Sequence, residues 1–597
     1  MTAAEALRDF VGAFARELHR CGVRHVCLCP GSRSTPLALV LREQPGLRLW
    51  VHLDERSAAF FALGMARALR QPVAVVTTSG TAAVNLAPAV AEARYGRVPL
   101  LALTADRPPE MREVGANQTI DQARLYGSHA KWTVEMPVPD GSPHLPRYAR
   151  AVARRAVATA RVAPAGPVHV NFPFREPLLP AEGPPAGLGM ESDLPPGATV
   201  WTVPRRPEAS DLRPLAETLA RARRGLIVCG PQEDPDLPAE VVALATALGF
   251  PVLADPLSQV RCGPHYSRLV IDSYDAFLRD EEIADALAPD VVLRLGGTPT
   301  SRPLLHYLQR HGAALQVLVD DGGWNDPALV AQAVVWGEPR AVCQALRRAL
   351  PERAGPDIEW ASRWQAVARA ARAALDEALS AQPVLSEPGA VRALADALPA
   401  GADLFLGNSM PVRDADAFFP GDLRPLRFLG NRGASGIDGV VSSALGGAAV
   451  SGRPTVLVLG DLSFYHDMNG LLAARRFGIA LTIVLLNNDG GGIFHLLPQA
   501  EREAHFEELF GTPHGLDFRH AAALYGLAYR QPESREELAC AVRESLASPT
   551  TTVLEVRTDR EANARLHREL WQRAVAAARQ AIGRPAVAAT EGKRWRL

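Results

Sequence analysis

The chain has 597 residues, with 64 basic against 65 acidic side chains and a net charge of −1. With 47% hydrophobic and 22% charged residues, it has the composition of a globular protein of several domains. The balanced charge excludes a chain that binds nucleic acid or an anionic membrane through its overall field. Only two cations are lysines, Lys131 and Lys593, and neither precedes Ser or Thr, which excludes a P-loop.

The cysteines and the apolar segments indicate the compartment in which the protein is found. Its seven cysteines are scattered, without the paired spacing of a zinc site, which favours a reducing compartment. The N-terminal residues carry charges at amphipathic-helix spacing, unlike a signal peptide, and no uncharged apolar run reaches the ~18 residues of a membrane span. We therefore expect a cytoplasmic protein without a membrane span.

Up to about residue 180, apolar runs alternate with helical stretches, starting from an amphipathic N-terminal helix. Continuous apolar strands joined by crossover helices predict a parallel sheet covered on both faces. The predicted strands are residues 25–29, 47–53, 73–77, 99–104 and 168–172, and the predicted helices include residues 57–70 and 81–95.

Two further blocks repeat this layout after a Pro- and Gly-rich linker at residues 178–204. We predict an α/β fold of three consecutive doubly wound parallel-sheet domains, at residues 1–185, 205–350 and 388–597. A helical connection is predicted between the last two domains, and a long helix followed by a loose tail at the C-terminus. The predicted strands are residues 225–229, 251–254, 291–295 and 315–319 in the second block, and 404–406, 455–459, 481–486 and 552–556 in the third.

Two polar motifs follow neighbouring strands of the third block. One strand runs into Gly460-Asp461, and the next runs into Asn487-Asn488-Asp489-Gly490, with Asn488 27 residues after Asp461. Ligands of parallel α/β sheets bind at the carboxyl ends of strands, so the two side chains are expected to converge. A carboxylate, an amide oxygen and the Gly490 carbonyl suit a hard divalent cation that also binds a diphosphate. Taken singly, Asp461 could be a helix cap and the second motif a turn.

This pair of motifs resembles the signature of thiamine diphosphate enzymes. The resemblance implies that Asp461, Asn488 and the Gly490 carbonyl hold Mg²⁺ or Mn²⁺ and thereby anchor the diphosphate of the cofactor. Other residues near these motifs and in two further loops would contact the cofactor as well. By resemblance they are Ser409, Met410, Ala434, Ser435, Gly460, Leu462, Ser463, Gly491, Gly492 and Ile493.

The same family places a glutamate at a strand end of the N-terminal block and a bulky aliphatic residue beneath the cofactor. Glu55 follows the predicted strand at 47–53 and, by resemblance, would be the catalytic residue that hydrogen-bonds the aminopyrimidine ring. Ile437 lies in the glycine-rich loop 430–439 and would hold the two cofactor rings in a folded shape. On its own, Glu55 could also be a first-turn glutamate favoured by the helix dipole.

Further segments resemble one branch of these enzymes, the MenD family of 2-succinyl-5-enolpyruvyl-6-hydroxy-3-cyclohexene-1-carboxylate synthases. The resemblance covers essentially the whole chain and is weakest in the middle block. The segments are Cys-Pro-Gly-Ser-Arg at 29–33, Thr-Ala-Asp-Arg at 104–107, Gly-Ala-Asn-Gln at 115–118, Gly-Asn-Ser-Met-Pro-Val-Arg-Asp at 407–414, the loop 431–439, and Gly-Asp-Leu-Ser-Phe-Tyr-His-Asp at 460–467.

The family decarboxylates 2-oxoglutarate and adds the succinyl-semialdehyde carbanion to isochorismate, a step of menaquinone biosynthesis. Both substrates are dicarboxylates, which arginine suits because its planar fork binds carboxylates bidentately. Arg302 is a candidate from the middle block, although this chain has Ser301 where the family often has a second basic residue. By resemblance, Ser32, Arg33, Arg107, Asn117 and Gln118 would face isochorismate, and Ser409, Arg413, Arg432 and Phe494 would surround the succinyl arm and the cofactor.

The family also implies a homodimer or a dimer of dimers, in which Glu55 of one chain and Asp461 of another complete each site. Two other hypotheses remain. An acetolactate-synthase-like carboligase or decarboxylase would share Glu55 and the metal motif without needing the arginines. A non-catalytic nucleotide-binding protein is suggested by strands ending in glycine, at 229–231 and 295–297, although no GxGxxG motif follows them.

Overall fold

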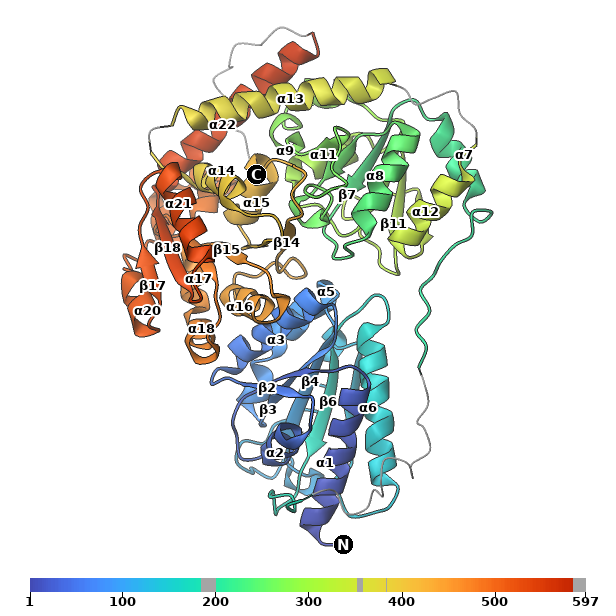
Figure 1. Ribbon diagram of the computed structural model, residues 1–597, viewed down its shortest axis with the longest axis vertical. Helices are drawn as coiled ribbons and strands as arrows, with labels where there is room; N and C mark the ends of the chain where they lie inside the picture. The colour runs from blue at the N-terminus through green and yellow to red at the C-terminus, as the bar shows by residue number, and fades with distance from the viewer. Residues whose placement is uncertain (184–199, 352–357, 383, 584–597) are drawn as a thin grey trace. The chain divides into compact units, whose positions relative to one another are not determined.

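The protein is described here by a computed structural model that covers residues 1–183, 200–351, 358–382 and 384–583 (Figure 1). Three six-stranded parallel sheets alternate with helices along the chain, which confirms the predicted α/β fold. The predicted tail and most of the predicted linker lie outside the described residues. The chain forms two compact units: Met1–Val203 with Asn431–Gly452 and His466–Ile479, and Pro204–Gly430 with Arg453–Tyr465 and Ala480–Leu597.

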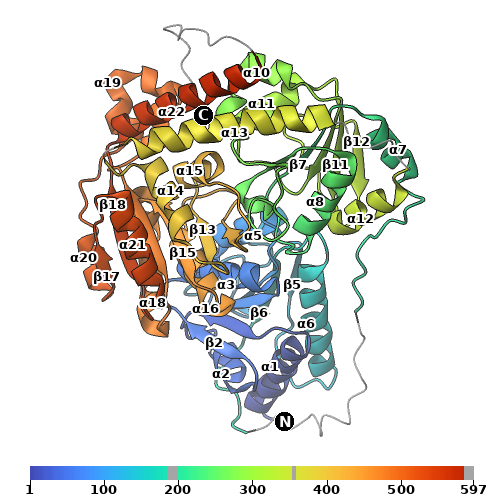
Figure 2. The same cartoon turned by 45° about the horizontal axis from the view of Figure 1, so that its top comes forward.

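The first sheet, in the first unit, has the strand order β2-β1-β3-β4-β6-β5. Its central strands β3 and β4 are buried throughout and mostly apolar, as expected of a sheet with helices on both faces. Helices α1 (Ala3–Arg20) and α6 (Leu145–Arg161) lie side by side on one face, and α3 (Glu55–Leu69) and α5 (Ala87–Tyr95) pack on the other (Figures 1 and 2). The strands are β1 (His25–Leu28), β2 (Arg48–Val51), β3 (Val73–Thr77), β4 (Leu100–Asp106), β5 (Trp132–Glu135) and β6 (Val168–Pro173).

The helix predicted at residues 81–95 is interrupted. It forms α4 (Thr81–Val84) and, after Leu86, α5. Pro88 stands in the first turn of α5, where its missing N–H costs no hydrogen bond, but it could not continue a helix from α4.

Helices from a later part of the sequence complete the first unit. These are α16 (Val440–Ser451) and α18 (Leu471–Phe477), and α16 packs closely along α3. Glycines make the approach possible: a Cβ at Gly64 of α3 would lie 1.9 Å from the carbonyl oxygen of Ser443, and one at Gly446 of α16 would lie 2.0 Å from that of Phe61. The crossing therefore joins the helix that begins at Glu55 to the helix that follows the glycine-rich loop.

The second sheet has a different order, β12-β11-β10-β7-β8-β9, so the chain starts in the middle and fills each half outward. Helices α8 (Leu237–Leu248) and α12 (Pro339–Ala349) pack on one face, and α11 (Arg302–Arg310) and α13 (Ile358–Ser380) lie on the other. The strands are β7 (Gly225–Cys229), β8 (Val252–Ala254), β9 (Val270–Ile271), β10 (Val291–Leu295), β11 (Leu315–Asp320) and β12 (Ala333–Trp336).

The third sheet returns to the arrangement of the first, with the order β14-β13-β15-β16-β18-β17. Helices α14 (Glu387–Ala397), α15 (Met410–Phe418) and α21 (Arg535–Leu546) cover one face, and α22 (Arg560–Ala581) runs beside α13 (Figures 1 and 2). The strands are β13 (Asp403–Leu406), β14 (Arg427–Leu429), β15 (Thr455–Gly460), β16 (Thr482–Asn487), β17 (Ala528–Arg530) and β18 (Thr552–Arg557).

Among the described residues, no helix combines the length and the apolar character needed to cross a membrane.

Candidate active site

The predicted site residues gather at the carboxyl ends of strands in the first and third sheets. In both sheets the chain leaves the first strand in one direction and later returns on its other side, so the strand order reverses between β1 and β3 and between β13 and β15. Open α/β sheets bind their ligands at such switch points.

Asp461 lies directly after β15 and is 2% exposed. Its Oδ2 accepts hydrogen bonds from the backbone N–H groups of Asn488, at 3.1 Å, and Gly490, at 3.0 Å, and its Oδ1 accepts one from Leu462 at 2.6 Å. Burial raises the pKa of this carboxyl, although the backbone donors oppose the shift. The two predicted motifs are therefore joined as the spacing suggested, since the carboxylate of one fixes the backbone of the other.

Asn488 is 8% exposed, and its two amide ends differ in environment. Its Nδ2 donates to Glu387 Oε1 at 2.7 Å, whereas its buried Oδ1 has no hydrogen-bond partner among the described residues. An unsatisfied buried acceptor costs about 1–3 kcal/mol, so this oxygen is suited to an additional ligand. Together with Asp461 it supplies the hard oxygen donors that Mg²⁺ prefers, and the site fits such a cation.

The glycine run after Asn488 is packed too tightly for side chains. Gly490 has φ = +135°, and a Cβ there would lie 2.0 Å from the carbonyl oxygen of Gly511. The Gly490 carbonyl accepts from Gly492 N at 3.0 Å and keeps a second lone pair for a cation. A Cβ at Gly492 would lie 2.5 Å from Asn488 Nδ2, so glycine is required beside the amide.

Two residues that sequence reasoning missed support this end of the site. The imidazole of His514 lies 3.3 Å from Asp461 Oδ2, measured from Nε2, while its Nδ1 accepts from Leu516 N at 3.0 Å. Glu387, 1% exposed, is the first residue of α14, and burial together with the nearby Asp414 carboxylate raises its pKa to about 7. Neither belongs to a motif, since His514 lies in a loop and Glu387 is an isolated glutamate about 100 residues from Asn488.

In the first unit, Glu55 is the first residue of α3 and is half-buried. Asp54 caps the helix by accepting from Ser57 N at 3.1 Å, so the main chain around Glu55 is fixed. The Glu55 side chain makes no hydrogen bond to any other residue that the structure describes. Electrostatic repulsion from Glu55, secondary to burial, contributes to raising the pKa of Cys29 at the end of β1. Glu55 thus follows β2, the strand after which the sequence placed it, and lies near the end of the neighbouring β1.

Asp467 connects the start of α3 to the start of α16. It is fully buried and accepts hydrogen bonds from Ser442 N at 2.6 Å, Ser442 Oγ at 2.9 Å and Ser57 Oγ at 3.3 Å. Burial raises the pKa of this carboxyl to about 6. It is the last residue of the segment 460–467, and no local pattern distinguishes it from its neighbours.

The glycine-rich loop before α16 is held by a single buried acid. Glu92 accepts from Gly433 N at 2.8 Å and from Ala434 N at 2.6 Å. Ser435, with φ = +59°, turns the loop outward, and Ile437 is 36% exposed. The loop therefore presents Ala434, Ser435 and Ile437 to the exterior of its unit, where a ligand can reach them.

Arg33 follows β1 and Arg107 follows β4. Arg107 donates from Nη1 to Ser79 Oγ and, at 3.1 Å, to the carbonyl oxygen of Gln118, and Arg33 donates to the carbonyl oxygen of Phe174 at 3.0 Å. Burial and the neighbouring Arg33 guanidinium lower the pKa of Arg107. Two guanidinium groups this close repel each other, and a bound anion would relieve the repulsion.

The other predicted isochorismate contacts surround this pair. Ser32, Asn117 and Gln118 are exposed, and Gln118, with φ = +56°, donates from Nε2 to the Ser79 carbonyl at 2.8 Å. Gln122, which was not predicted, is buried behind them and accepts from Gly80 N at 2.8 Å. The structure thus brings these five predicted residues to the ends of β1, β3 and β4, with Gln122 as support.

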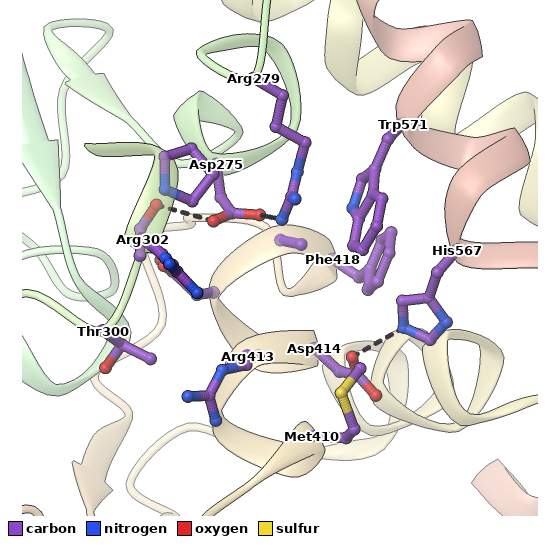
Figure 3. Close-up of a pocket in the computed structure, with 14 residues that line it drawn as sticks. Asp275, Arg279, Thr300, Arg302, Met410, Arg413, Asp414, Phe418, His567 and Trp571 are labelled. Carbon is purple, nitrogen blue, oxygen red and sulfur yellow. Dashed lines mark hydrogen bonds and ion pairs between the residues drawn. The ribbon is translucent and has the colours of Figure 1, made fainter. Parts of the chain in front are cut away.

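In the second unit, Ser409 has φ = +70° and begins α15, and its carbonyl oxygen accepts from Arg413 at 2.6 Å. Arg413 and Arg302 line one pocket, together with the Asp414–His567 pair, in which Oδ1 and Nε2 are 2.9 Å apart (Figure 3). Ser301, which stands where the family often has a second basic residue, has a structural role here. It caps α11 and donates to Asp275 at 2.7 Å. It is a structural residue, whereas Arg302 is exposed.

The remaining predicted residues fall in both units. Phe494 lies after the glycine run, with its ring 5.4 Å from that of Phe510, and Arg432 belongs to the glycine-rich loop of the first unit. Glu55, the arginine pair and this loop are thus in the first unit, and the proposed metal ligands, Ser409, Arg413 and Arg302 are in the second.

The glycines of the middle sheet serve packing. A Cβ at Gly230 would lie 1.8 Å from the carbonyl oxygen of Gly297, and Gly297 N donates to the Pro231 carbonyl at 2.8 Å. The two strand ends that suggested a nucleotide-binding protein are therefore in direct backbone contact, which fills the switch point between β7 and β10.

Comparison with known proteins gives a consistent result. Residues 8–125 match the family described as thiamine pyrophosphate enzyme, N-terminal TPP binding domain; residues 206–406 match the middle domain of thiamine pyrophosphate enzymes; and residues 417–556 match the C-terminal TPP binding domain. The 2-succinyl-5-enolpyruvyl-6-hydroxy-3-cyclohexene-1-carboxylate synthase of Geobacillus kaustophilus (strain HTA426) is 52% identical over 578 residues, covering 95% of this chain and 98% of that protein.

The chain belongs to this synthase family. A second member, from Chloroflexus aurantiacus (strain ATCC 29366 / DSM 635 / J-10-fl), is 50% identical over 573 residues, covering 95% of this chain and 96% of its own length. The fold is also that of the benzoylformate decarboxylase from Polynucleobacter necessarius, with a TM-score of 0.70 at 19% identity over 92% of this chain and 99% of that one. Membership of the synthase family favours our main hypothesis over an acetolactate-synthase-like enzyme.

Proposed function

We propose that this protein condenses 2-oxoglutarate with isochorismate, with loss of CO₂, to give 2-succinyl-5-enolpyruvyl-6-hydroxy-3-cyclohexene-1-carboxylate, using thiamine diphosphate and Mg²⁺ or Mn²⁺. It would thus catalyse the synthase step of menaquinone biosynthesis. The observation that carries the proposal is the Asn488 carbonyl oxygen, which has no partner in the described part of the chain and lies beside the buried Asp461 carboxylate, in a chain of this family.

The cation would be held by Asp461, Asn488 Oδ1 and the Gly490 carbonyl, and the diphosphate would bind to it and to the adjacent glycine-rich backbone. Gly460 leaves room for a ligand, since a Cβ built there meets nothing within 4 Å. When bound, thiamine diphosphate supplies the carbon nucleophile and the electron sink for decarboxylating a 2-oxoacid.

Glu55 would form a hydrogen bond to the aminopyrimidine ring through its carboxyl group. Its place in the first turn of a capped helix keeps its backbone fixed, and its half-buried side chain is free to face a ligand. Ile437, exposed on a loop that Glu92 anchors, would support the cofactor from below.

The arginines would bind the substrates. Arg33 and Arg107, which repel each other, would together bind the carboxylates of isochorismate, with Ser32, Asn117 and Gln118 at the rim. Arg413 and Arg432 would serve the carboxylate that remains on the succinyl arm after CO₂ leaves, beside Ser409 and Phe494. Arg302 shares the pocket of Arg413 and would add charge there.

We also propose that the active species is a homodimer or a dimer of dimers, in which Glu55 of one chain serves the metal site of its partner. The seven cysteines are all unpaired, which is in keeping with a reducing cytoplasm. Sedimentation measures the oligomeric state. Mixing Glu55→Gln with Asp461→Ala chains tests the shared site, because a mixed dimer would regain one intact site and therefore activity.

The function is tested by incubating the purified chain with 2-oxoglutarate, isochorismate, thiamine diphosphate and Mg²⁺ and identifying the product by mass. We expect release of one CO₂ per product, and no comparable turnover when pyruvate replaces 2-oxoglutarate. Equal or faster turnover of pyruvate would instead identify an acetolactate-synthase-like enzyme.

A further inference from the structure

The Asn488 side chain presents its oxygen to the proposed cation only if its amide is turned the correct way. An asparagine amide has a donor end and an acceptor end of nearly the same shape, so its local packing does not decide which end faces a ligand. A neighbouring atom that already accepts a hydrogen bond from another donor can decide it.

Glu387 is that neighbour. Its Oε1 accepts from Asn488 Nδ2 at 2.7 Å and from Thr558 Oγ at 3.2 Å, and an oxygen that accepts two donors offers no place for the Asn488 carbonyl. Turning the amide would set two acceptor oxygens against each other in a buried site. The opposite end of the amide, Oδ1, is then the end left without a partner among the described residues.

The support comes from a separate, well-anchored element. Glu387 begins α14, where Ser386 caps the helix by accepting from Gly389 N at 3.2 Å, and the positive end of the helix dipole favours a carboxylate there. Helix α14 packs against α15 and α21, so the carboxylate does not depend on the glycine run for its position. Asp461 fixes the backbone of this run, and Glu387 fixes its side chain.

We propose that Glu387 is a positioning residue that orients the Asn488 amide and so presents its carbonyl oxygen to the divalent cation. This inference rests on the proposed function, since it needs the cation. Supporting groups of this kind typically contribute about 10- to 100-fold to metal affinity.

The test is a titration of Mg²⁺ into the full-length chain with thiamine diphosphate present, followed by calorimetry. The Glu387→Gln variant keeps the side-chain volume but adds a donor end, which can bind the Asn488 carbonyl and turn it away. We expect its dissociation constant for Mg²⁺ to rise by about 10- to 100-fold. Asp403→Asn is the matched control. Asp403 is also buried, at the start of β13 in the third sheet, and pairs with Arg427 and Arg453, so this variant should bind Mg²⁺ as the wild type does.

An exchange variant separates orientation from simple damage. Asn488→Asp alone sets two carboxylates against each other, whereas the double variant Glu387→Gln/Asn488→Asp restores one carboxylate and one amide and keeps an oxygen toward the cation. We expect the double variant to bind Mg²⁺ at least about 5-fold more tightly than Glu387→Gln alone. The electron paramagnetic resonance spectrum of bound Mn²⁺ gives a second readout, and we expect it to change in Glu387→Gln and to revert in the double variant.

The outcomes are distinct. If Glu387→Gln binds Mg²⁺ as tightly as the wild type, or if the double variant recovers neither affinity nor spectrum, the positioning role is wrong although the proposed function stands. If the wild-type chain itself binds no Mg²⁺ with thiamine diphosphate, both are wrong. If Glu387→Gln fails to fold, the folded double variant, compared with Asn488→Asp, decides the question by the same criterion.

Discussion

The first and third sheets have the same strand order but carry different chemistry at equivalent strand ends. Their first, second, third and fourth strands correspond in pairs: β1 with β13, β2 with β14, β3 with β15 and β4 with β16. Arg107, after β4, stands where the third sheet has Asn488, and Glu55, after β2, corresponds to the start of the glycine-rich loop.

The carboxylates of the two sheets illustrate the difference best. Asp461 is buried and receives three backbone hydrogen bonds, as suits the anchoring role that we propose for it. Glu55 is half-buried at the tip of a helix, as suits a group that exchanges a proton with a ligand. If the proposed roles hold, the topology supplies the position, and the local backbone decides whether a carboxylate there anchors a cation or reacts.

The largest expected effect is on the reactive carboxylate. Glu55→Gln keeps the side-chain shape but cannot take up a proton, so we expect turnover to fall by about 10²- to 10⁴-fold while thiamine diphosphate still binds. Steady-state rates and calorimetry check the two parts. Glu43→Gln, a surface change at the end of α2 (Thr35–Glu43), is the control. Near-normal turnover would remove the distinction drawn between the two acids.

The anchoring carboxylate should behave in the opposite way. Asp461→Ala removes a ligand and releases the backbone of residues 488 and 490, so we expect the apparent affinities for Mg²⁺ and thiamine diphosphate to weaken together, by at least about 100-fold. Excess cofactor should recover part of the rate, which it cannot do for Glu55→Gln. An unchanged cofactor affinity would contradict the assigned role.

The pair of Arg33 and Arg107 tests the proposed substrate-binding end of the first sheet. Arg107→Met removes a charge-assisted hydrogen bond of about 2 kcal/mol, so we expect KM for isochorismate to rise by about 30-fold, with little change in the affinity for Mg²⁺. Arg154→Met, which breaks an ion pair with Glu17 on the helical face, is the matched control. An equal effect of both variants would show that Arg107 acts only on stability.

The last effect is on stability rather than on catalysis and concerns Asp467, which joins α3 to α16. Its folded-state pKa of about 6 lies above the ordinary value of 3.8, so its contribution to stability is full below about pH 4 and is lost as the pH rises through 6. Relative to Asp467→Asn, the wild type should lose on the order of 2 kcal/mol of unfolding free energy between pH 4 and 6. Arg56 and Asp54 also face this carboxyl, with opposite effects on its pKa. Denaturant unfolding at several pH values measures the difference, and parallel curves would refute the shift.

Much of the fold could be predicted from the sequence, and the omissions share a location. The five strands that were not predicted, β5, β9, β12, β14 and β17, all lie at sheet edges. Trp132–Glu135 and Ala528–Arg530 are short, partly exposed and without the continuous apolar run that marks a central strand, and Val270–Ile271 is only two residues long.

The site residues also divide into those that could be predicted from the sequence and those that could not. Asp461 and Asn488 could be predicted because strand ends and glycines mark them in the sequence. Glu387, Glu92 and Asp467 could not, because each is a single acid whose partner lies far away in the chain and becomes its neighbour only after folding. Supporting residues leave no local pattern.

The pairing of Arg33 with Arg107 has a consequence for kinetics. A guanidinium stays protonated throughout the range in which enzymes work, even where a neighbour weakens its hold on the proton. The attraction that these two side chains exert on a dianion would therefore be the same in mildly acidic and mildly alkaline buffer. A bell-shaped pH–rate profile would then originate in the carboxyl groups, in the coenzyme or in the substrates. Binding of isochorismate by the two arginines would be independent of pH.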